Sequence, residues 1–391
     1  MTSRKRSPLV VIFITVFLDL VGFGIVIPVL PLYAERFGAS ALVVGFLLGS
    51  YSFMQFLCAP ILGKISDRVG RRPVLLLSII GTSLGFFLMG AAKTLELLFV
   101  ARIIDGITGG NISTAQAYIA DVTPPEQRSK GMGLIGAAFG LGFIFGPAIG
   151  GILSRVSLAA PFLFAGSLAA CNAVAIYFLL PESLPEQRRK QAKRHSSVIE
   201  VFREGKATSL ALVMAAYFFS TVAFSLLTAT YPLFTEKRFG FDAMHNGYIF
   251  AAQGVLGAIL QGLLLGHLLK LTGDKMLAAI GTVVLAAGLF LLPASRTVLL
   301  LFAGTALVAI GHGLLAAPLN GLASRDVDAA SQGRVLGLMQ STASFARIVG
   351  PILGGWLLNR DTAALLVDFG RTPYWTAGGI MVIALFLASC I

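Results

Sequence analysis

The chain has 391 residues, of which 56% are hydrophobic and only 12% are charged, and its formal net charge is +12. Soluble domains carry roughly a quarter charged residues, so this composition excludes an ordinary soluble domain and indicates an integral membrane protein. Whether the positive charge marks a nucleic-acid partner depends on where the basic residues fall along the chain.

Twelve apolar segments are long enough for a membrane helix, which needs about 20 residues. Six lie before a polar stretch at 182–207 and six follow it. They occupy residues 8–33, 43–63, 73–92, 96–119, 131–153, 159–181, 208–234, 245–269, 275–293, 297–321, 333–358 and 372–391. The sequence therefore predicts an all-α integral membrane protein with twelve transmembrane helices.

The loops between these segments carry basic residues mainly on one side of the membrane. When the loops are assigned alternately, the side with the N-terminus holds twenty Lys and Arg residues and the opposite side holds eight. Cytoplasmic loops are enriched in Lys and Arg, so we expect a multi-pass protein of the cell membrane with both termini cytoplasmic. The net charge then reflects topology, and no nucleic-acid partner is expected.

The two halves of the chain repeat each other. Three pairs of matched features lie at an offset of 201 to 204 residues: PLYAERFG at 31–38 with PLFTEKRFG at 232–240, Gly63 and Gly70 with Gly266 and Gly273, and GPAIGG at 146–151 with GPILGG at 350–355. Parallel repeats of this kind occur in transporters whose substrate site lies between the halves. We expect an N-terminal six-helix bundle over 1–181, a cytoplasmic linker over 182–207 and a C-terminal six-helix bundle over 208–391.

Four segments carry a resemblance to a known family: GKISDRVGRRPVLL at 63–76, ARIIDGITGG at 101–110, YIADVTPPEQR at 118–128 and GLGFIFGPAIGG at 140–151. The chain resembles the twelve-helix drug–proton antiporters of the major facilitator superfamily, and is most similar to the tetracycline–proton antiporter branch. The first segment is similar to the superfamily's cytoplasmic signature, and the last to the antiporter motif of the fifth helix. The resemblance implies the major facilitator fold, a small-molecule substrate and coupling to protons.

The loop after the second span is charged and short. It carries Asp67, Arg68, Arg71 and Arg72. An acid here can interact with the positive N-terminal end of a helix near Gly333 or Arg334 in the other half. Arg71 or Arg72 can pair with Asp121. The loop is either simply a basic cytoplasmic loop or a gate that keeps the cytoplasmic face closed in one state of the cycle. The resemblance favours the gate.

Small residues line one side of the expected fifth helix. They are Gly142, Gly146, Pro147, Gly150 and Gly151. Small residues on one stripe let two helix backbones approach closely, and proline permits a bend. Ordinary close packing and a role in rocking between states both remain open, and both can hold together.

Four charges lie at membrane depth: Asp19, Arg102, Asp105 and Arg347. An ionised side chain at a helix centre costs about 3 kcal/mol on insertion scales, so such residues usually face a cavity or a partner and mark function. Arg102 and Asp105 are three residues apart and are therefore neighbours on one helical face. We expect Asp105 to be a second site of protonation, modulated by Arg102.

Asp19 is the only charge between Ser7 and Ala34, and nothing on its own helix can pair with it. An apolar setting favours the neutral form of a carboxyl, and access to water favours the charged form. A carboxyl that alternates between the two settings carries a proton. The alternatives are a protonated, hydrogen-bonded Asp that only stabilises the bundle, or a static pair with an Arg of another helix.

Polar residues on several expected helices are candidates for a central substrate cavity. They are Gln116, Tyr217, Gln253, His312, Asn320, Gln340 and Arg347. A lone His on a helix is often only a packed, hydrogen-bonded residue, so a proton relay at His312 competes with that interpretation. The cysteines, Cys58, Cys171 and Cys390, have no metal-like spacing, and we expect them to pack in the core.

The sequence contains no catalytic triad, phosphate loop or metal cluster, so we expect no enzyme activity and no cofactor or metal. The favoured function is a proton-coupled secondary transporter that exports small amphipathic compounds by alternating access, acting as a monomer in the lipid bilayer. One alternative is a proton-coupled importer of a nutrient or metabolite. Another is a membrane receptor or structural subunit without a transport cycle.

Overall fold

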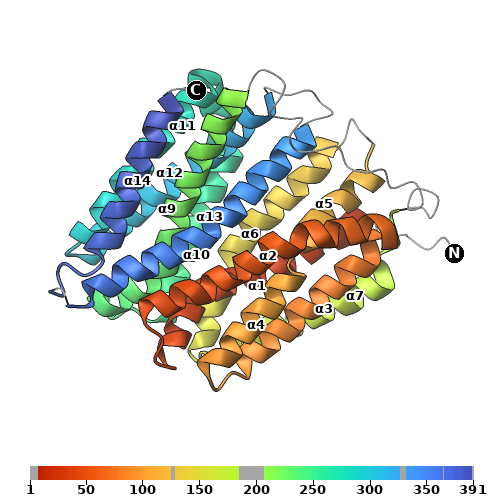
Figure 1. Cartoon of the computed structure of the whole chain (residues 1–391), viewed down its shortest axis with the longest axis horizontal. Coiled ribbons are helices and arrows are strands. Elements are labelled where there is room, and N and C mark those ends of the chain that lie inside the picture. Colours follow the sequence, from red (N-terminus) through yellow and green to blue (C-terminus); the bar gives the residue numbers. More distant parts are fainter. Residues whose placement is uncertain (1–7, 125–127, 185–206, 326–331, 364, 390–391) are drawn as a thin grey trace. The chain divides into compact units, whose positions relative to one another are not determined.

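A computed structural model describes residues 8–124, 128–184, 207–325, 332–363 and 365–389 of the chain (Figure 1). Each of the twelve expected spans is occupied by one or more helical elements, and the described residues contain no strand. Eight of the described helices are long and apolar enough to cross a membrane by length and composition. The fold is therefore all-α, with twelve membrane spans.

The first six spans are formed by seven helices. These are α1 (Pro8–Glu35), α2 (Ala41–Val69), α3 (Arg71–Gly90), α4 (Leu95–Thr108), α5 (Asn111–Val122), α6 (Arg128–Ser154) and α7 (Ala160–Leu179). The expectation of one continuous helix over 96–119 is wrong, because the span breaks at Gly109 and Gly110, where ψ rises to 27° and 7°. Two adjacent glycines resist the helical conformation most strongly because they have the most backbone freedom to lose.

The second six spans contain a π-helical turn and a kink. They are formed by α9 (Ala207–Phe239), α10 (Ala243–Ile259), the π turn η3 (Leu260–Leu264), α11 (Leu265–Ala294), α12 (Val298–Arg325), α13 (Gln332–Arg360), the short 3₁₀ turn η4 (Asp361–Ala363) and α14 (Arg371–Ser389). Gly273 interrupts α11 with φ 75° and ψ 170°. This break separates the two spans that the sequence places at 245–269 and 275–293.

The internal repeat is also present in the backbone. Among the described residues the positive-φ positions are all glycines, and four of these five form two repeat-related pairs. Gly38 (φ 77°) matches Gly240 (φ 68°), and Gly70 (φ 120°) matches Gly273 (φ 75°). Left-handed backbone is readily adopted only by glycine. The repeated glycines therefore end helices in the same way in both halves of the chain.

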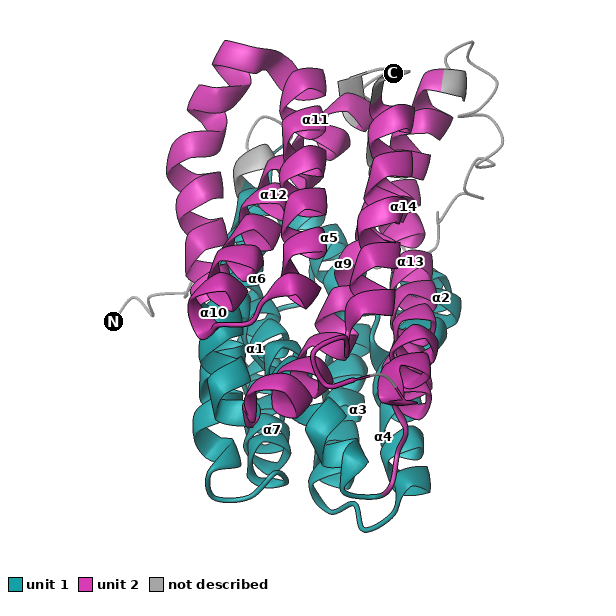
Figure 2. Ribbon diagram, turned by 90° about the vertical axis from the view of Figure 1, so that its left-hand side faces the viewer, with its two compact units in different colours: residues 1–37, 50–194, 243–251 teal, residues 38–49, 195–242, 252–391 magenta. Residues whose placement is uncertain are grey.

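The chain divides into two compact units, coloured separately in Figure 2. Unit 1 contains residues 1–37, 50–194 and 243–251, and unit 2 contains 38–49, 195–242 and 252–391. The first residues of α2 thus group with unit 2, and the first residues of α10 group with unit 1. The expected boundaries at 181 and 208 remain a prediction, and most of the expected linker lies outside the described residues.

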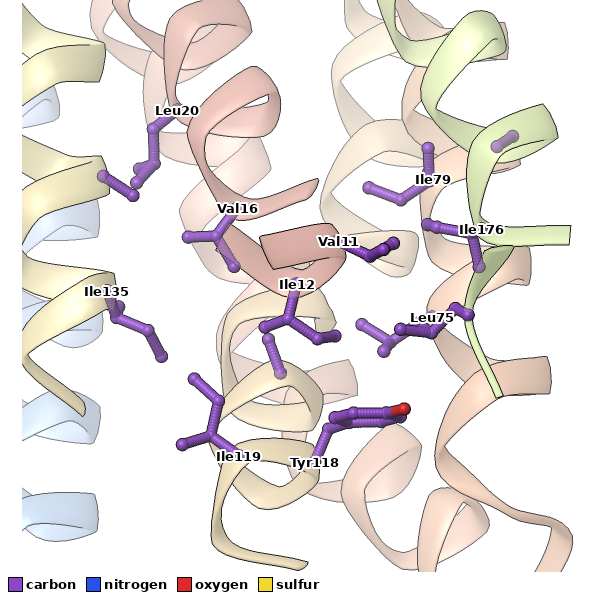
Figure 3. Packing of buried hydrophobic residues seen from close by; sticks show 14 of the residues in the cluster. Val11, Ile12, Val16, Leu20, Leu75, Ile79, Tyr118, Ile119, Ile135 and Ile176 are labelled. Atoms are coloured by element: carbon purple, nitrogen blue, oxygen red, sulfur yellow. The ribbon is translucent and has the colours of Figure 1, made fainter. Parts of the chain in front are cut away.

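In unit 1, α1 packs along α6, and α3 packs along α7. Figure 3 shows a cluster of buried apolar residues in which Leu75 and Ile79 of α3 lie beside Ile176 of α7. A buried polar contact joins α1 to α7, since the Asn172 amide donates to the Thr15 carbonyl oxygen at 3.3 Å. The Thr15 hydroxyl lies 3.2 Å from Asn172 Oδ1.

In unit 2, α9 packs along α13, and α11 packs along α12 and α14. The helix pair α9 and α13 is related by the repeat to α1 and α6. The Tyr231 hydroxyl of α9 lies 2.9 Å from the Thr305 hydroxyl of α12. The Arg238 guanidinium donates to the carbonyl oxygens of Pro293 and Ser295 at 2.6 and 2.8 Å. These contacts satisfy carbonyl groups at the end of α11.

The cysteines differ from the expectation. Cys58 on α2 is half-buried, while Cys171 on α7 is exposed, so the core placement is wrong for Cys171. Cys171 precedes the buried Asn172 and faces away from the core that its neighbour enters. Cys390 lies outside the described residues.

Candidate functional site

The break between α4 and α5 creates a polar site in unit 1. A helix break leaves backbone groups without their usual partners, and in a membrane protein these must be satisfied by other groups of the protein. Gln55 of α2 supplies one partner, because its amide nitrogen donates to the Gly109 carbonyl oxygen at 2.9 Å. The same nitrogen donates to the Tyr51 hydroxyl at 3.1 Å. Gln55 of α2 therefore stabilises the break between α4 and α5.

Asp19 of α1 faces this break. Asn111, the first residue of α5, is buried, and its side-chain oxygen accepts from the Ile112 amide at 2.8 Å. Its amide group is therefore free to donate, and it lies near the Asp19 carboxyl. The Asp19 side chain is partly exposed. Its carboxyl also lies close enough to Asp105 for the two charges to interact.

Arg102 and Asp105 form a buried ion pair on α4. Arg102 Nη1 lies 3.2 Å from Asp105 Oδ2, and the side chains are 3% and 6% exposed. The expected contact on one helical face is therefore present. The Arg102 guanidinium lies over the Tyr51 ring, 4.3 Å from its centroid. The Thr82 hydroxyl of α3 also lies near the Asp105 carboxylate. Such additional partners are what a buried pair requires to offset desolvation.

Glycines on neighbouring helices make room for this ion pair. A Cβ atom at Gly85 of α3 would lie 2.9 Å from the Asp105 Cβ atom. A Cβ atom at Gly106 of α4 would lie 2.6 Å from the Tyr51 carbonyl oxygen of α2. Both separations are too short for real side chains, so α2, α3 and α4 meet only because these positions are glycine.

The expected charged loop is reduced to Gly70, because Asp67 and Arg68 lie at the end of α2 and Arg71 and Arg72 begin α3. These charged residues form a network that includes the expected contact with Asp121. Arg71 Nη1 lies 2.6 Å from Asp67 Oδ1, and Arg71 Nε lies 3.1 Å from Asp121 Oδ2. Arg71 is mostly buried and also donates to the Ser66 hydroxyl at 2.7 Å. Arg68 is exposed. The expected partner of Asp67 near Gly333 and Arg334 concerns side chains outside the described residues and stays a prediction.

Glu182 ties the end of α7 to the start of α3. Its two carboxylate oxygens accept from the backbone amides of Arg71 and Arg72 at 2.9 and 3.2 Å. A carboxylate at a helix N-terminus satisfies free amides and interacts favourably with the helix dipole. The Ser183 hydroxyl donates to Asp121 at 3.1 Å, next to the Arg71 contact. The network therefore connects α2, α3, α5 and the segment after α7.

The small residues of α6 face two different helices. A Cβ atom at Gly142 would lie 2.6 Å from the Leu20 Cβ atom of α1, and one at Gly150 would lie 3.1 Å from the Ile25 Cα atom. On another side, a Cβ atom at Gly151 would lie 3.0 Å from the Met244 Cα atom of α10. The expected close approach is present, and it involves α10 as well as α1.

The repeat-related residues of α13 make the corresponding contacts in unit 2. A Cβ atom at Gly350 would lie 2.7 Å from the Val222 carbonyl oxygen of α9. A Cβ atom at Gly355 would lie 2.2 Å from the Ala41 carbonyl oxygen of α2. The two halves therefore use the same small residues for the same pair of helix contacts.

The candidate cavity residues lie in both units and are not all brought into contact. Gln116 and Gln340 are exposed, and Tyr217 and Asn320 are half-buried. The His312 ring stacks on the Phe224 ring, with centroids 3.8 Å apart. Their membership of one common cavity stays a prediction.

Other polar contacts of this group lie within single helices. The Arg347 guanidinium donates to the Ser344 hydroxyl at 3.1 Å, and the Asn320 amide donates to the Ala316 carbonyl oxygen at 2.8 Å. Gln253 Nε2 and His312 Nδ1 are buried and have no hydrogen-bond partner among the described residues. Gln253 Nε2 is therefore able to donate a further hydrogen bond, and His312 Nδ1 is able to form one.

Sequence reasoning missed several residues of the site in unit 1. Asn111 lies beside Asp19, and the Tyr51 ring lies against the Arg102 guanidinium. Gln55 donates to the backbone at the helix break. A glycine pair inside a span at 109–110 followed by Asn is the signal for Asn111, since Asn is favoured where a helix begins. Tyr51 and Gln55 lie four residues apart on one face of α2, but their partners lie 51 and 54 positions further along the chain.

The sequence and the structure can be compared with known proteins at this point. The family model of the Major Facilitator Superfamily matches residues 12–351 and also 246–391. The chain belongs to the Major Facilitator Superfamily.

Relatives within this superfamily include drug resistance proteins. The chain is 37% identical over 354 residues to "Tetracycline resistance protein, class C" of Escherichia coli, covering 90% of this chain and 89% of that protein. It is 28% identical to "Multidrug resistance protein 2" of Bacillus subtilis, covering 98% and 95%. The crystal structure of the human organic anion transporter MFSD10 (TETRAN) superposes with a TM-score of 0.74 at 26% identity, covering 99% and 100%.

Membership of the Major Facilitator Superfamily makes the chain a multi-pass membrane transporter and accounts for the twelve spans and the internal repeat. The family and its relatives point to a transporter and not to an enzyme.

Proposed function

We propose that this Major Facilitator Superfamily protein is a proton-coupled exporter of small amphipathic compounds that works by alternating access in the cell membrane, as a monomer with both termini cytoplasmic. The observation that carries the proposal is the cluster of Asp19, Arg102 and Asp105 in the membrane-spanning part of unit 1. Ionisable groups at this depth are costly and are retained mainly for function.

Asp19 is the best candidate for the proton carrier. Asp105 is engaged by Arg102, whereas among the described residues Asp19 forms no ion pair and its contact is the neutral Asn111 amide. An amide can donate to a carboxylate and can accept from a protonated carboxyl after a flip of its oxygen and nitrogen. The Asn111 side chain can therefore interact with Asp19 in both of its protonation states.

Arg102 and Asp105 would set the electrostatic environment of Asp19. The negative charge of Asp105 opposes ionisation of Asp19, and the positive charge of Arg102 offsets it. A movement that changes the Arg102 to Asp105 contact would then alter the readiness of Asp19 to release its proton. In this arrangement Asp105 is the second candidate for protonation.

The network around Arg71 is the candidate gate. Arg71 bridges Asp67 and Asp121 over distances of 2.6 and 3.1 Å, in a half-buried setting where ion pairs are stronger than at a fully solvated surface. We infer that this network, with Arg68 and Arg72 beside it, forms in one state of the cycle and loosens in the other.

Transport in proteoliposomes tests the proposal. A pH gradient is imposed, and accumulation of tetracycline and of other amphipathic drugs is measured. Antiport predicts accumulation on the acidic side, because protons leaving that side drive substrate into it. A proton-coupled importer would accumulate substrate on the alkaline side. A receptor or structural subunit would show no gradient-driven movement in either direction.

Asp19→Asn should abolish proton-coupled accumulation and leave the protein folded. Asp368→Asn is the matched control, since it makes the same chemical change at an exposed residue outside the spans. Asp105→Asn alone leaves Arg102 buried and unpaired, which costs about 3–5 kcal/mol in comparable pairs. The double variant with Arg102→Gln and Asp105→Asn removes both charges and separates loss of coupling from loss of folding. Normal coupling in Asp19→Asn would reject Asp19 as the carrier.

A further inference from the structure

An apolar groove runs along unit 1 between α3 and α7, on the side facing away from the core. Its volume is about 470 Å³, within the range of small-ligand sites. Its walls come from these two helices alone and include Leu76, Ile80, Phe87, Val174, Tyr177 and Phe178. The lining contains two residues with side-chain hydroxyls, Ser83 and Tyr177, and the Ser83 hydroxyl donates to the Gly166 carbonyl oxygen at 2.9 Å. The groove therefore offers a ligand almost only apolar contacts.

The groove faces away from the buried cluster between the same two helices. Leu75 and Ile79 of α3 point with Ile176 of α7 into the core of unit 1 (Figure 3). On the groove side, Val174 is 57% exposed and Phe178 is 74% exposed. In a membrane-spanning protein this side meets lipid chains. The groove lining on α3 extends over twelve residues from Leu76 to Phe87, and these two residues lie about 17 Å apart at the rise of an α-helix.

This length is close to half of the hydrocarbon core of a bilayer, which is about 30 Å thick. One acyl chain of one leaflet therefore fits the groove along its length. The groove begins one turn from Arg71 and Arg72, the first residues of α3, so its occupant belongs to the leaflet at that end. The distribution of basic residues predicts this leaflet to be the cytoplasmic one.

An arginine without a carboxylate partner lies at this end of the groove. The Arg72 guanidinium donates to the carbonyl oxygen of Tyr177, a groove residue, and its Cζ atom lies 5.6 Å from the centroid of the Tyr177 ring. Arg71 next to it contacts two carboxylates, whereas Arg72 forms no ion pair in the described part of the chain. The Glu182 carboxylate beside both residues is occupied by their backbone amides.

We propose that the groove between α3 and α7, together with Arg72, binds an anionic phospholipid of the leaflet at the α3 N-terminus. One acyl chain occupies the groove, and the phosphate pairs with the Arg72 guanidinium, whose planar donors match phosphate geometry. The cytoplasmic leaflet is rich in anionic lipids that attract basic residues at the membrane surface. The charge of Arg72 thus selects the headgroup, and the groove holds the chain.

Native mass spectrometry of the purified full-length chain tests this site independently of transport. The protein is titrated with phosphatidylglycerol and with phosphatidylcholine of the same acyl composition. The wild type should retain phosphatidylglycerol severalfold better than phosphatidylcholine. Arg72→Gln should lower phosphatidylglycerol retention to the phosphatidylcholine level, while Arg72→Lys keeps a preference because it keeps the charge. Val174→Trp should fill the groove and lower the retention of both lipids.

Two control variants separate the site from general effects. Arg155→Gln removes an equal charge at an exposed residue beyond the C-terminal end of α6. Leu77→Trp places the same large ring on an exposed residue of α3 that does not line the groove. Equal retention of the two lipids by the wild type, or equal behaviour of Arg72→Gln and Arg155→Gln, would overturn the headgroup contact. Equal behaviour of Val174→Trp and Leu77→Trp would overturn the groove.

Discussion

Gly146 of α6 and Gly24 of α1 lie so close that a Cβ atom at position 146 would be 2.7 Å from the Gly24 Cα atom. The same Cβ atom would be 2.6 Å from the Val21 carbonyl oxygen. Both atoms that the added Cβ would meet belong to the backbone, so no flexible side chain could move aside. Asp19 lies on the same helix as Val21 and Gly24, so this contact also fixes the height of Asp19 along α6.

Gly146→Ala should therefore destabilise the protein. Overpacking of a tightly packed interface costs about 1–3 kcal/mol, and here the obstacle is backbone. Thermal unfolding in detergent, followed by the loss of monomeric protein, measures the effect. Gly140→Ala is the control on the same helix, because a Cβ atom there meets nothing within 4 Å. An equal loss of stability in both variants would show that a general effect of substitution in this helix, and not the α1 contact, is responsible.

The repeat makes a second, paired prediction for Gly45 of α2 and Gly247 of α10. A Cβ atom at Gly45 would lie 2.3 Å from the Pro351 carbonyl oxygen, and one at Gly247 would lie 2.4 Å from the Pro147 carbonyl oxygen. Both the glycines and the prolines are repeat-related. Gly45→Ala and Gly247→Ala should therefore lower the unfolding temperature by similar amounts, and both should slow transport.

Each of these two helices supplies its own control. Gly63 on α2 and Gly257 on α10 have nothing within 4 Å of an added Cβ atom. Gly63→Ala and Gly257→Ala should leave the unfolding temperature unchanged or raise it slightly, since alanine is the better helix former. A large effect at Gly45 with none at Gly247 would contradict the equivalence of the two helix contacts.

The sequence predicted the spans, the repeat and the local contacts, because these depend on composition and on helical spacing. Arg102 and Asp105 are three residues apart, so their pairing follows from helix geometry alone. The Asn111 contact with Asp19 and the Tyr51 ring under Arg102 were not predicted. They join residues from different helices, and their meeting depends on how glycines let those helices approach. The break at Gly109 and Gly110 was not predicted either.

The gate makes a prediction about Asp67. Asp67→Asn removes one of the two carboxylates that hold Arg71 and leaves Asp121 in place. We expect slower turnover with little change in substrate affinity, because the network lies at the ends of the helices and not among the membrane-depth residues. Transport rates in proteoliposomes and equilibrium binding to the purified protein measure the two quantities separately. Lys64→Gln, at an exposed position of α2 one turn earlier, is the control. Intact turnover with weakened binding would contradict the assignment.

The last prediction concerns Asp361, which begins the turn before α14 in unit 2. Its carboxylate is buried and accepts from the backbone amides of Gly370 and Thr372 at 3.1 and 3.0 Å. The Thr372 hydroxyl donates to its other oxygen. Asp361→Ala leaves these donors without a partner, which costs about 1–3 kcal/mol for a buried group. We expect a clear fall in the unfolding temperature.

Asp368 provides the contrast within the same segment. It forms an ion pair with Arg371 at 3.5 Å, but the two side chains are 43% and 51% exposed. Exposed pairs contribute about 0–1 kcal/mol, so Asp368→Ala should change the unfolding temperature little, and added salt should remove any difference from the wild type. Both variants remove one carboxylate from the same short segment and change the net charge equally. A difference in their stability therefore reports on burial and backbone hydrogen bonding. A larger loss of stability in Asp368→Ala than in Asp361→Ala would mean that charge near Arg371, and not capping of α14, holds this segment in place.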